Sequence, residues 1–351
     1  MRLIFVTQQV DPENPVLGAT VAKLRALAAR VEEVVVLADG AAPDALPSNC
    51  RVRLFRSGTK AGRGARFAAA LLDELRRRPR PAVVVAHMCP IYAVLAAPLA
   101  RPAGTRVILW FAHWKRTRTL DLAVHLSNTV ASVDVRAVPI EARKVVGIGH
   151  GIDTTAFSCR EAPAGTAPLE ALALGRYSSA KGLTTMVEAV GLARASGLDV
   201  RLRCHGTAGN AQERDDRAAL GRLVGSLGLD DFVVLGGPVP RSGIPELLAS
   251  ADVLVNNMRP GAPDKAVFEA CACCVPVLVS NPLFDTLVDD LVPQLRFDRD
   301  DAGQLAERLA GFAALAPGVR HELGRTLRSR VAESHSVDSW ADRIVALAEA
   351  R

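Results

Sequence analysis

Long apolar runs are absent from this chain of 351 residues. A helix that spans a membrane needs about 20 consecutive apolar residues, and no segment approaches that length. The amino terminus, residues 1–6, enters an apolar strand without the charged leader and small-residue cleavage site of a secretory signal. These absences predict a cytoplasmic protein.

Aromatic residues are scarce, at 4% of the chain, although 49% of the residues are hydrophobic. Ala, Val and Leu supply most of the apolar content, which suits helices packed on parallel strands better than an all-β sandwich. A chain of 351 residues also exceeds what one hydrophobic core usually supports. We therefore expect two α/β domains.

The cysteines show no pattern of metal ligands or of paired disulfides. Seven are present, an odd number, with no Cys-x-x-Cys spacing and no accompanying histidine cluster. Cys271, Cys273 and Cys274 fall on an expected buried helix, where a free cysteine behaves as a small apolar residue. We predict no disulfide, no metal site and no cofactor.

Two common nucleotide motifs are missing as well. No Gly-x-Gly-x-x-Gly follows the first strand and no Gly-x-x-x-x-Gly-Lys-Ser/Thr occurs, so dinucleotide and P-loop chemistry lose their best support. Residues 298–300 have the Asp-x-Asp form that binds a metal-nucleotide elsewhere. Because they precede a helix, we instead predict that Asp300 or Asp301 is its N-cap.

Charge is unevenly distributed along the chain. Residues 1–150 hold 22 basic and 11 acidic residues, whereas residues 151–351 hold 21 and 26. Much of the basic excess lies in residues 51–80. A basic face attracts anionic lipid headgroups or acidic acceptors, which would make the protein peripheral to the inner face of a membrane. The simpler interpretation, that these arginines end a helix and solvate it, is favoured. No nucleic-acid partner is expected, and the oligomeric state stays open.

Apolar strand-like runs alternate with helical patterns throughout, which is typical of doubly wound sheets. The predicted helices include residues 18–29 and 64–77. The predicted strands are residues 3–7, 33–37, 52–55, 82–86, 107–111, 130–133 and 145–148, and then 172–175, 201–205, 232–235, 253–255 and 277–279. Two Rossmann-like sheets follow from this pattern.

The domain boundary is expected where the periodic pattern stops. Residues 154–168 are rich in Ala, Pro, Thr and Gly and are predicted to link domain 1–153 to domain 169–335. Residues 336–351 are predicted to form an amphipathic helix. The sequence leaves open whether this helix packs on the second domain or crosses back to the first.

Two strand-to-helix junctions in the second half carry charge suited to a nucleotide. After the strand at 172–175 come Arg176 and Lys181, and cations at a helix start favour a phosphate. After the strand at 253–255, Asp264 is a plausible N-cap, and Glu269 lies just over one turn into the helix among small residues. A carboxylate there needs donors, and a ribose diol supplies two hydroxyls.

These residues resemble the carboxyl-terminal domain of family 4 glycosyltransferases. The resemblance lies in Gly-Arg…Lys-Gly at 175–182, followed by Asp-Lys-x-x-x-Glu-Ala-x-Ala-x-x-Val-Pro-Val at 264–277. Residues 149–157 are similar to the family's segment that leads into the linker. The resemblance implies the GT-B fold, in which two Rossmann-like domains face each other across a cleft.

Site residues follow from the resemblance position by position. Arg176 and Lys181 would hold the donor diphosphate, Glu269 would bind the ribose, and the backbone around Val239 and Arg241 would face the nucleobase. Further positions implied in donor binding or catalysis are Gly18 in the loop at 15–19, Asp264, Lys265, and His113 after the strand at 107–111. His87 and His205 are weaker candidates that would line the cleft.

One departure from the family pattern concerns the donor sugar. The family usually has a second acidic residue eight positions before the ribose glutamate, and Gly261 occupies that position. Backbone N–H groups of Gly261 and Ala262, or the Asp264 carboxylate, are the candidates to replace it.

The resemblance implies a retaining, metal-independent glycosyltransferase that moves a sugar from a nucleoside diphosphate to an acceptor hydroxyl. Arg176 and Lys181 would stabilise the departing diphosphate, and His113 would orient the sugar. A sugar-nucleotide epimerase and a catalytically impaired nucleotide-binding partner protein stay open as alternatives. So do the base, the sugar, and a lipid, polysaccharide or natural-product acceptor.

Overall fold

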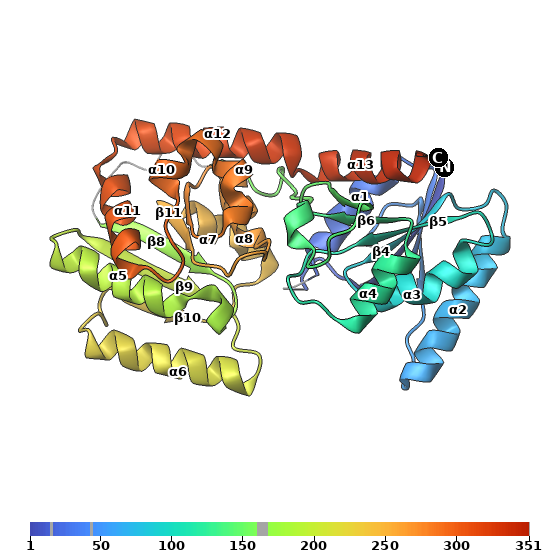
Figure 1. Ribbon diagram of the computed structural model, residues 1–351, viewed down its shortest axis with the longest axis horizontal. Helices are drawn as coiled ribbons and strands as arrows, with labels where there is room; N and C mark the ends of the chain where they lie inside the picture. Colours follow the sequence, from blue (N-terminus) through green and yellow to red (C-terminus); the bar gives the residue numbers. More distant parts are fainter. Residues whose placement is uncertain (15–16, 43–44, 160–167, 351) are drawn as a thin grey trace. The chain divides into compact units, whose positions relative to one another are not determined.

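A computed structural model describes residues 1–14, 17–42, 45–159 and 168–350 (Figure 1). The chain divides into two compact units, one of Met1–Asp153 with Ser334–Arg351 and one of Thr154–Glu333. We call them the amino-terminal and carboxyl-terminal units. Of the segment expected to be a linker, residues 154–159 belong to the carboxyl-terminal unit, and residues 160–167 lie outside the described residues.

The amino-terminal unit is built on one parallel sheet. Within its described residues the sheet has seven strands in the order β3-β2-β1-β4-β5-β6-β7. These strands are β1 (Arg2–Val10), β2 (Glu33–Ala41), β3 (Cys50–Leu54), β4 (Val83–His87), β5 (Arg106–Trp110), β6 (Thr129–Ser132) and β7 (Val145–Gly147). Each predicted strand of this half is confirmed, with ends that shift by a few residues.

Helices cover both faces of this sheet, because successive residues of a buried strand point to opposite faces. The helices are α1 (Ala19–Ala28), α2 (Lys60–Arg76), α3 (Pro90–Ala100), α4 (Arg118–Leu126), the short turn η1 (Val135–Ala137) and α13 (Val337–Glu349). Phe67 of α2, Ala96 of α3 and Leu120 of α4 share one apolar core with Leu109 of β5. The next strand residue, Trp110, instead contacts Trp340 of α13, edge to face, with 5.7 Å between ring centroids.

The last helix therefore belongs to the amino-terminal unit. It packs along α1, where the Arg30 Nε donates a hydrogen bond of 2.6 Å to the Asp342 carboxylate. The buried side of α13 carries Trp340, Ala341 and Ile344, as its amphipathic pattern predicts.

The carboxyl-terminal unit contains a second parallel sheet. Its described residues form five strands in the order β10-β9-β8-β11-β12. The strands are β8 (Leu169–Leu174), β9 (Val200–His205), β10 (Val233–Gly236), β11 (Val253–Asn256) and β12 (Val277–Val279). Strand order reverses between β8 and β11, and ligands of open α/β sheets bind beyond the carboxyl ends of the strands at such a point.

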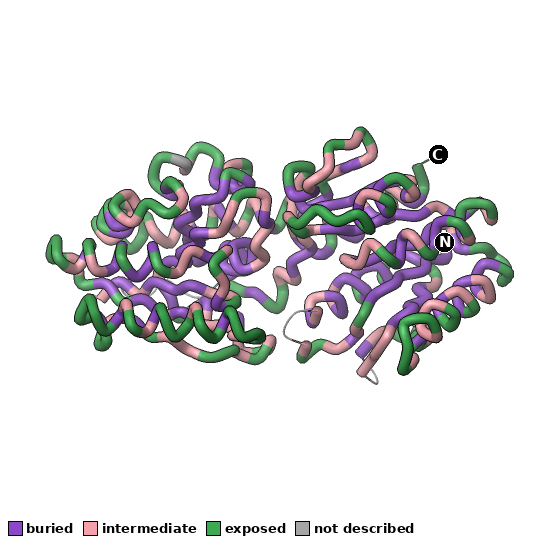
Figure 2. The backbone as a smooth tube through the Cα atoms, turned by 60° about the horizontal axis from the view of Figure 1, so that its bottom comes forward, coloured by how far each residue is buried: buried purple, intermediate pink, exposed green. Residues whose placement is uncertain are grey.

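Helices surround this sheet too, and their outward sides are exposed while β8, β11 and β12 are largely buried (Figure 2). The helices are α5 (Leu183–Ala195), α6 (Ala211–Ser226), α7 (Ile244–Ala249), α8 (Lys265–Ala272), α9 (Asp285–Val288), α10 (Val292–Leu295), α11 (Ala302–Ala314) and α12 (Pro317–Ser334). Short turns of 3-10 helix are η2 (Ser179–Lys181), η3 (Arg241–Gly243), η4 (Pro282–Phe284) and η5 (Asp289–Leu291). None of the helices in the described residues is long and apolar enough to cross a membrane.

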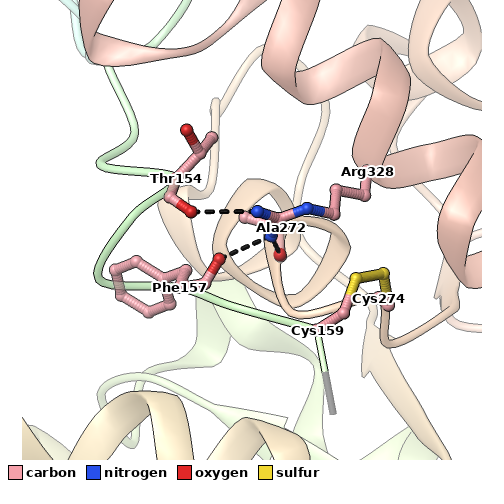
Figure 3. The surroundings of a disulfide bond; sticks show 6 residues. All are labelled: Thr154, Phe157, Cys159, Ala272, Cys274 and Arg328. Atoms are coloured by element: carbon pink, nitrogen blue, oxygen red, sulfur yellow. Dashed lines mark hydrogen bonds between the residues drawn. A yellow bond between two sulfur atoms is a disulfide. The ribbon is translucent and has the colours of Figure 1, made fainter. Parts of the chain in front are cut away.

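The prediction that the chain forms no disulfide is wrong. Cys159 and Cys274 are joined, with their Cα atoms 5.0 Å apart (Figure 3). Cysteine spacing missed this bond because the two residues are separated by 115 positions and only the fold brings them together. Cys271 and Cys273 are free, buried cysteines, as predicted.

Candidate functional site

The loops that follow β8 and β11 lie side by side at the point where the strand order reverses. The two strands are hydrogen-bonded neighbours, so their carboxyl ends are adjacent. The Arg259 N–H donates to the Ala180 carbonyl at 3.1 Å, and the Asn257 amide donates to the Gly182 carbonyl at 3.2 Å. The two charged junctions singled out in the sequence therefore form one surface of the carboxyl-terminal unit.

Lys181 is the buried cation of this surface, with 9% of the residue exposed. Its Nζ donates a 2.8 Å hydrogen bond to the Leu174 carbonyl at the end of β8 and pairs with the Asp264 carboxylate. The side chain passes directly over Gly175, where an added Cβ would fall on the ammonium group. Gly175 is therefore required for Lys181 to reach this position.

Asp264 is the N-cap of α8, as predicted, and its side chain accepts a hydrogen bond from the Ala266 N–H at 3.3 Å. Its other carboxylate oxygen is shared by Lys181 and by the Asn256 amide, which donates at 2.6 Å. The carboxylate thus joins the two loops by charge-assisted hydrogen bonds. Its oxygens already accept three bonds, so it is poorly suited to replace the acidic residue absent at Gly261.

Arg176 differs from Lys181 in exposure, because 64% of its side chain is accessible to solvent. Its Nε donates a 2.8 Å hydrogen bond to Glu213 of α6, a residue that sequence reasoning missed. Glu213 is buried, and the Gly209 N–H also donates to it at 2.8 Å. Burial acts to raise the pKa of the Glu213 carboxyl, but the hydrogen bonds from Arg176 and Gly209 hold the pKa below its usual value.

Glu269 is buried on α8, so the alternative of a solvent-facing glutamate is excluded. Its carboxylate accepts a 2.6 Å hydrogen bond from Arg241 and lies 3.5 Å from the Lys265 ammonium, one helical turn away. Arg241 in turn lies over the Phe157 ring, 4.9 Å from the centroid. Three residues expected to contact the donor separately are therefore one connected group.

Val239 and Gly261 belong to loops at the edge of this group. Val239 is half-buried in the turn before η3, next to Arg241. Gly261 has φ +77°, a left-handed conformation that favours glycine over other residues. Glycine therefore suits the conformation of the loop at this position.

The predicted residues of the amino-terminal unit lie at two different loops. Gly18 is the N-cap of α1, and an added Cβ would lie 2.5 Å from the Pro12 carbonyl oxygen. Pro15 and Val16 of the same predicted loop lie outside the described residues. His113 is exposed just beyond β5, where its Nδ1 accepts a 3.0 Å hydrogen bond from the Lys115 N–H.

The two weaker candidates, His87 and His205, differ in how far they are buried. His87 is 4% exposed and its Nδ1 lies 3.3 Å from the Thr7 hydroxyl, so it belongs to the core. Burial, with the nearby Lys23 charge, lowers the pKa of His87 well below its usual value. His205 is half-buried at the end of β9. Asp301 caps α11 through the Gln304 N–H at 2.8 Å, which confirms the capping role predicted there.

Acidic, histidine and cysteine side chains do not gather as metal ligands in the part of the chain that is described. No group of three or more such residues has a suitable arrangement there.

A comparison with protein families matches this same surface. The family described as Glycosyl transferases group 1 matches residues 168–314, a range that contains β8, β11, α8 and the charged pairs of Lys181, Arg176 and Glu269. Residues 168–314 of the chain are therefore similar to a group 1 glycosyl transferase domain. The predicted resemblance is thereby confirmed.

Two curated relatives of this group 1 domain are provisionally named colanic acid biosynthesis glycosyltransferase WcaL. The protein of Escherichia coli strain K12 is 29% identical over 172 residues, which cover 47% of this chain and 41% of that protein. The protein of Salmonella typhimurium strain LT2 is 27% identical over 225 residues, covering 61% and 52%. The matches thus span about half the length of these relatives.

Solved structures match both units of the chain. Anabaena HepE, in a complex with UDP and glucose, has a TM-score of 0.77 at 16% identity and covers 100% of both chains. A glycosyltransferase from Rickettsia africae has a TM-score of 0.75 at 14% identity and covers 99% of this chain and 97% of its own. At these identities the likeness concerns the fold, and it confirms the predicted GT-B class.

Proposed function

We propose that the protein is a retaining glycosyltransferase that moves a sugar from a nucleoside diphosphate donor to an acceptor hydroxyl. The observation that carries the proposal is the placement of buried Lys181 and Glu269 after the adjacent strands β8 and β11, where strand order reverses, inside the segment that matches group 1 glycosyl transferases. Phosphates bind at helix starts with flanking cations, and this surface offers both.

Each cation of the proposed site is held by a carboxylate of the same unit. Lys181 is paired with Asp264, Arg176 with Glu213, and Arg241 with Glu269. A buried ammonium without a partner is costly, so the pairs keep the cations in position before a donor arrives. When the donor binds, its diphosphate contacts Lys181 and Arg176 while these cations keep their carboxylate partners. The ribose hydroxyls donate to Glu269, which also keeps its bonds to Arg241 and Lys265.

In the proposed reaction the diphosphate leaves as the acceptor hydroxyl approaches the same face of the sugar. Arg176 and Lys181 stabilise the negative charge that develops on the leaving phosphate. A leaving phosphate oxygen takes the proton of the acceptor, so no strong protein base is required. For His113 we propose the orienting of the donor sugar, and for the loop at Gly261 and Ala262 contacts to the sugar hydroxyls.

We propose a uridine diphosphate sugar as donor and a polysaccharide intermediate as acceptor. HepE, a structural neighbour, is crystallised with UDP-glucose, and the curated relatives are named for biosynthesis of a polysaccharide. A lipid-linked acceptor would bring the protein to a membrane, and the exposed Arg76 and Arg78 at the end of α2 are then the residues to contact anionic headgroups. Binding to anionic vesicles at increasing salt tests that contact.

Nucleotide binding is the direct test. Calorimetry with UDP, GDP and ADP should show binding of one of them, and the matching nucleotide sugars should be slowly hydrolysed. Lys181→Ala should weaken binding about 100-fold, since a charge-assisted contact to phosphate is lost, and His113→Ala much less. Lys60→Ala, an exposed lysine on α2, is the control. Absence of binding by all three nucleotides, or a larger loss from His113→Ala, would contradict the proposal.

A further inference from the structure

The disulfide in the carboxyl-terminal unit lies at the end of the helix that carries Glu269. Cys274 lies two residues after the last residue of α8, and Cys159 lies two residues after Phe157 (Figure 3). Cys159 is exposed, whereas 7% of Cys274 is exposed. The bond therefore ties a surface segment to the carboxyl end of a buried helix.

The surface segment reaches the candidate site through one aromatic ring. Phe157 is 2% exposed, and the Arg241 guanidinium lies over its ring at 4.9 Å. Arg241 donates to the Glu269 carboxylate at 2.6 Å. A displacement of Phe157 would therefore remove the cation–π contact that holds Arg241. Arg241 would then position Glu269, the residue proposed to bind ribose, less firmly.

A second set of bonds holds the same two segments, and these bonds are noncovalent. Arg328 of α12 donates to the Phe157 carbonyl at 2.6 Å, to the Thr154 carbonyl at 3.0 Å, and also to the Ala272 carbonyl (Figure 3). Opening the disulfide would leave only these bonds to hold the segment, so the unit should stay folded while the Phe157 ring is held less firmly.

We propose that Cys159 and Cys274 form a redox-modification site whose reduction by a dithiol weakens nucleotide binding at Glu269. One thiolate of the dithiol attacks the sulfur of exposed Cys159, forming a mixed disulfide and releasing Cys274, which takes up a proton. The second thiol of the dithiol then displaces Cys159. Two protein thiols and one oxidised dithiol result, with two electrons transferred.

The neighbouring thiol of Cys273 does not attack the disulfide in place of the added dithiol. Cys273 is free and 1% exposed, and burial raises the pKa of its thiol to about 12. The thiolate is the attacking species in disulfide exchange, so Cys273 stays unreactive at neutral pH. Reaction from solvent at Cys159 is the open route.

The nucleotide part of this inference rests on the proposed function, so the experiment has two readouts. The full chain is purified without reductant, and thiols are counted before and after dithiothreitol treatment. The count should rise from the five free cysteines to all seven. Hydrogen exchange is then followed in α8 and in the turn at Arg241, and UDP affinity is measured by calorimetry on both forms.

Reduction should speed exchange in α8 and weaken UDP binding about threefold, the scale of one cation–π contact. Cys159→Ser should match the reduced form and no longer respond to dithiothreitol. Cys89→Ser, which removes a free cysteine of the amino-terminal unit, should behave as the unaltered chain.

Equal exchange in α8 and equal UDP affinity in both redox forms would overturn the inference, leaving the disulfide a purely structural crosslink. Seven free thiols without reductant would overturn it as well. If neither form binds UDP, the proposed UDP donor fails, whereas the exchange rates of α8 still decide whether the disulfide controls this helix.

Discussion

Each unit has a cluster of buried ion pairs, and the two clusters lie at opposite ends of the strands of their own sheets. In the amino-terminal unit, Glu74 of α2 is fully buried and contacts Arg2 at 2.7 Å and Arg51 at 2.6 Å, near the amino ends of β1 and β3. In the carboxyl-terminal unit, the pairs of Lys181 and of Glu269 lie beyond the carboxyl ends of β8 and β11.

The position along the strand separates a structural charge cluster from a candidate site. Ligands of open parallel sheets bind outside the carboxyl ends of the strands, where loops and helix starts offer N–H groups. The amino ends offer no such groups to a ligand. We therefore expect the Glu74 cluster to control stability, and the Lys181 and Glu213 pairs to control nucleotide affinity.

The largest effect is expected from Glu74→Gln. Removing the carboxylate leaves the buried Arg2 with Glu33 as its remaining charged partner, so we expect a loss of about 3 kcal/mol, the lower end of the range for breaking a buried pair. Chemical denaturation measures the loss, and UDP affinity should be unchanged. The control is Glu32→Gln, because Glu32 is 74% exposed and should contribute little. A variant of normal stability but weaker UDP binding would reverse the comparison.

A pH titration sharpens the same contrast. Burial acts to raise the pKa of the Glu74 carboxyl, yet its hydrogen bonds from Arg51 and Arg53 lower the pKa from 4.5 to about 2. Because the pKa is lowered, the stabilisation is complete above pH 4.5 and is lost as the pH falls through 2, by about 3 kcal/mol. Denaturation curves between pH 2 and pH 6 should show this loss. They should be flatter for Glu74→Gln.

Glu213→Gln tests a positioning residue of the carboxyl-terminal unit. Arg176 is largely exposed, so without the Glu213 charge its side chain should sample other rotamers, and UDP binding should weaken about tenfold. Asp215→Asn on the same helix is the control, since Asp215 is exposed. Unchanged UDP affinity together with lowered stability would mean that Glu213, like Glu74, contributes to stability and not to nucleotide binding.

Asp264→Asn should have the smallest effect and the opposite direction. Asparagine has a single side-chain oxygen, which either caps α8 or accepts from Lys181, and it carries no charge to compete with phosphate for the ammonium. UDP should bind about threefold more tightly, a change of about 0.7 kcal/mol. Asp301→Asn, at the N-cap of α11, is the matched control. Weaker binding would mean that the Asp264 charge is needed to position Lys181.

Local signals explain why much of this fold is predictable. Apolar runs such as residues 3–7 and 253–255 are too apolar for exposed strands, and they lie between amphipathic helices, so parallel sheets follow. Asp264 is predictable as an N-cap because capping depends on residues within one turn. The sequence makes Lys181 a candidate phosphate ligand only because its loop follows a buried strand.

Contacts between distant segments were outside the reach of these signals. Glu213 lies 37 residues from Arg176, and no periodicity or capping rule connects them. The bond between Cys159 and Cys274, and the placement of Phe157 under Arg241, likewise depend on how the segments pack. Its position at the end of a strand makes His87 a candidate site residue in the sequence. Strand position alone does not tell which side chains are buried beneath the edge of a sheet.

By itself, the sequence determined the two parallel sheets, their strands, and the charged residues at the ends of β8 and β11. Hydrophobic periodicity and helix capping act over a few residues, so the sequence alone is enough to recognise them. Only the tertiary structure decided that Lys181 is held by Asp264, Glu269 by Arg241, and Cys274 by Cys159. Partner choice depends on distances across the fold, which residue spacing does not contain.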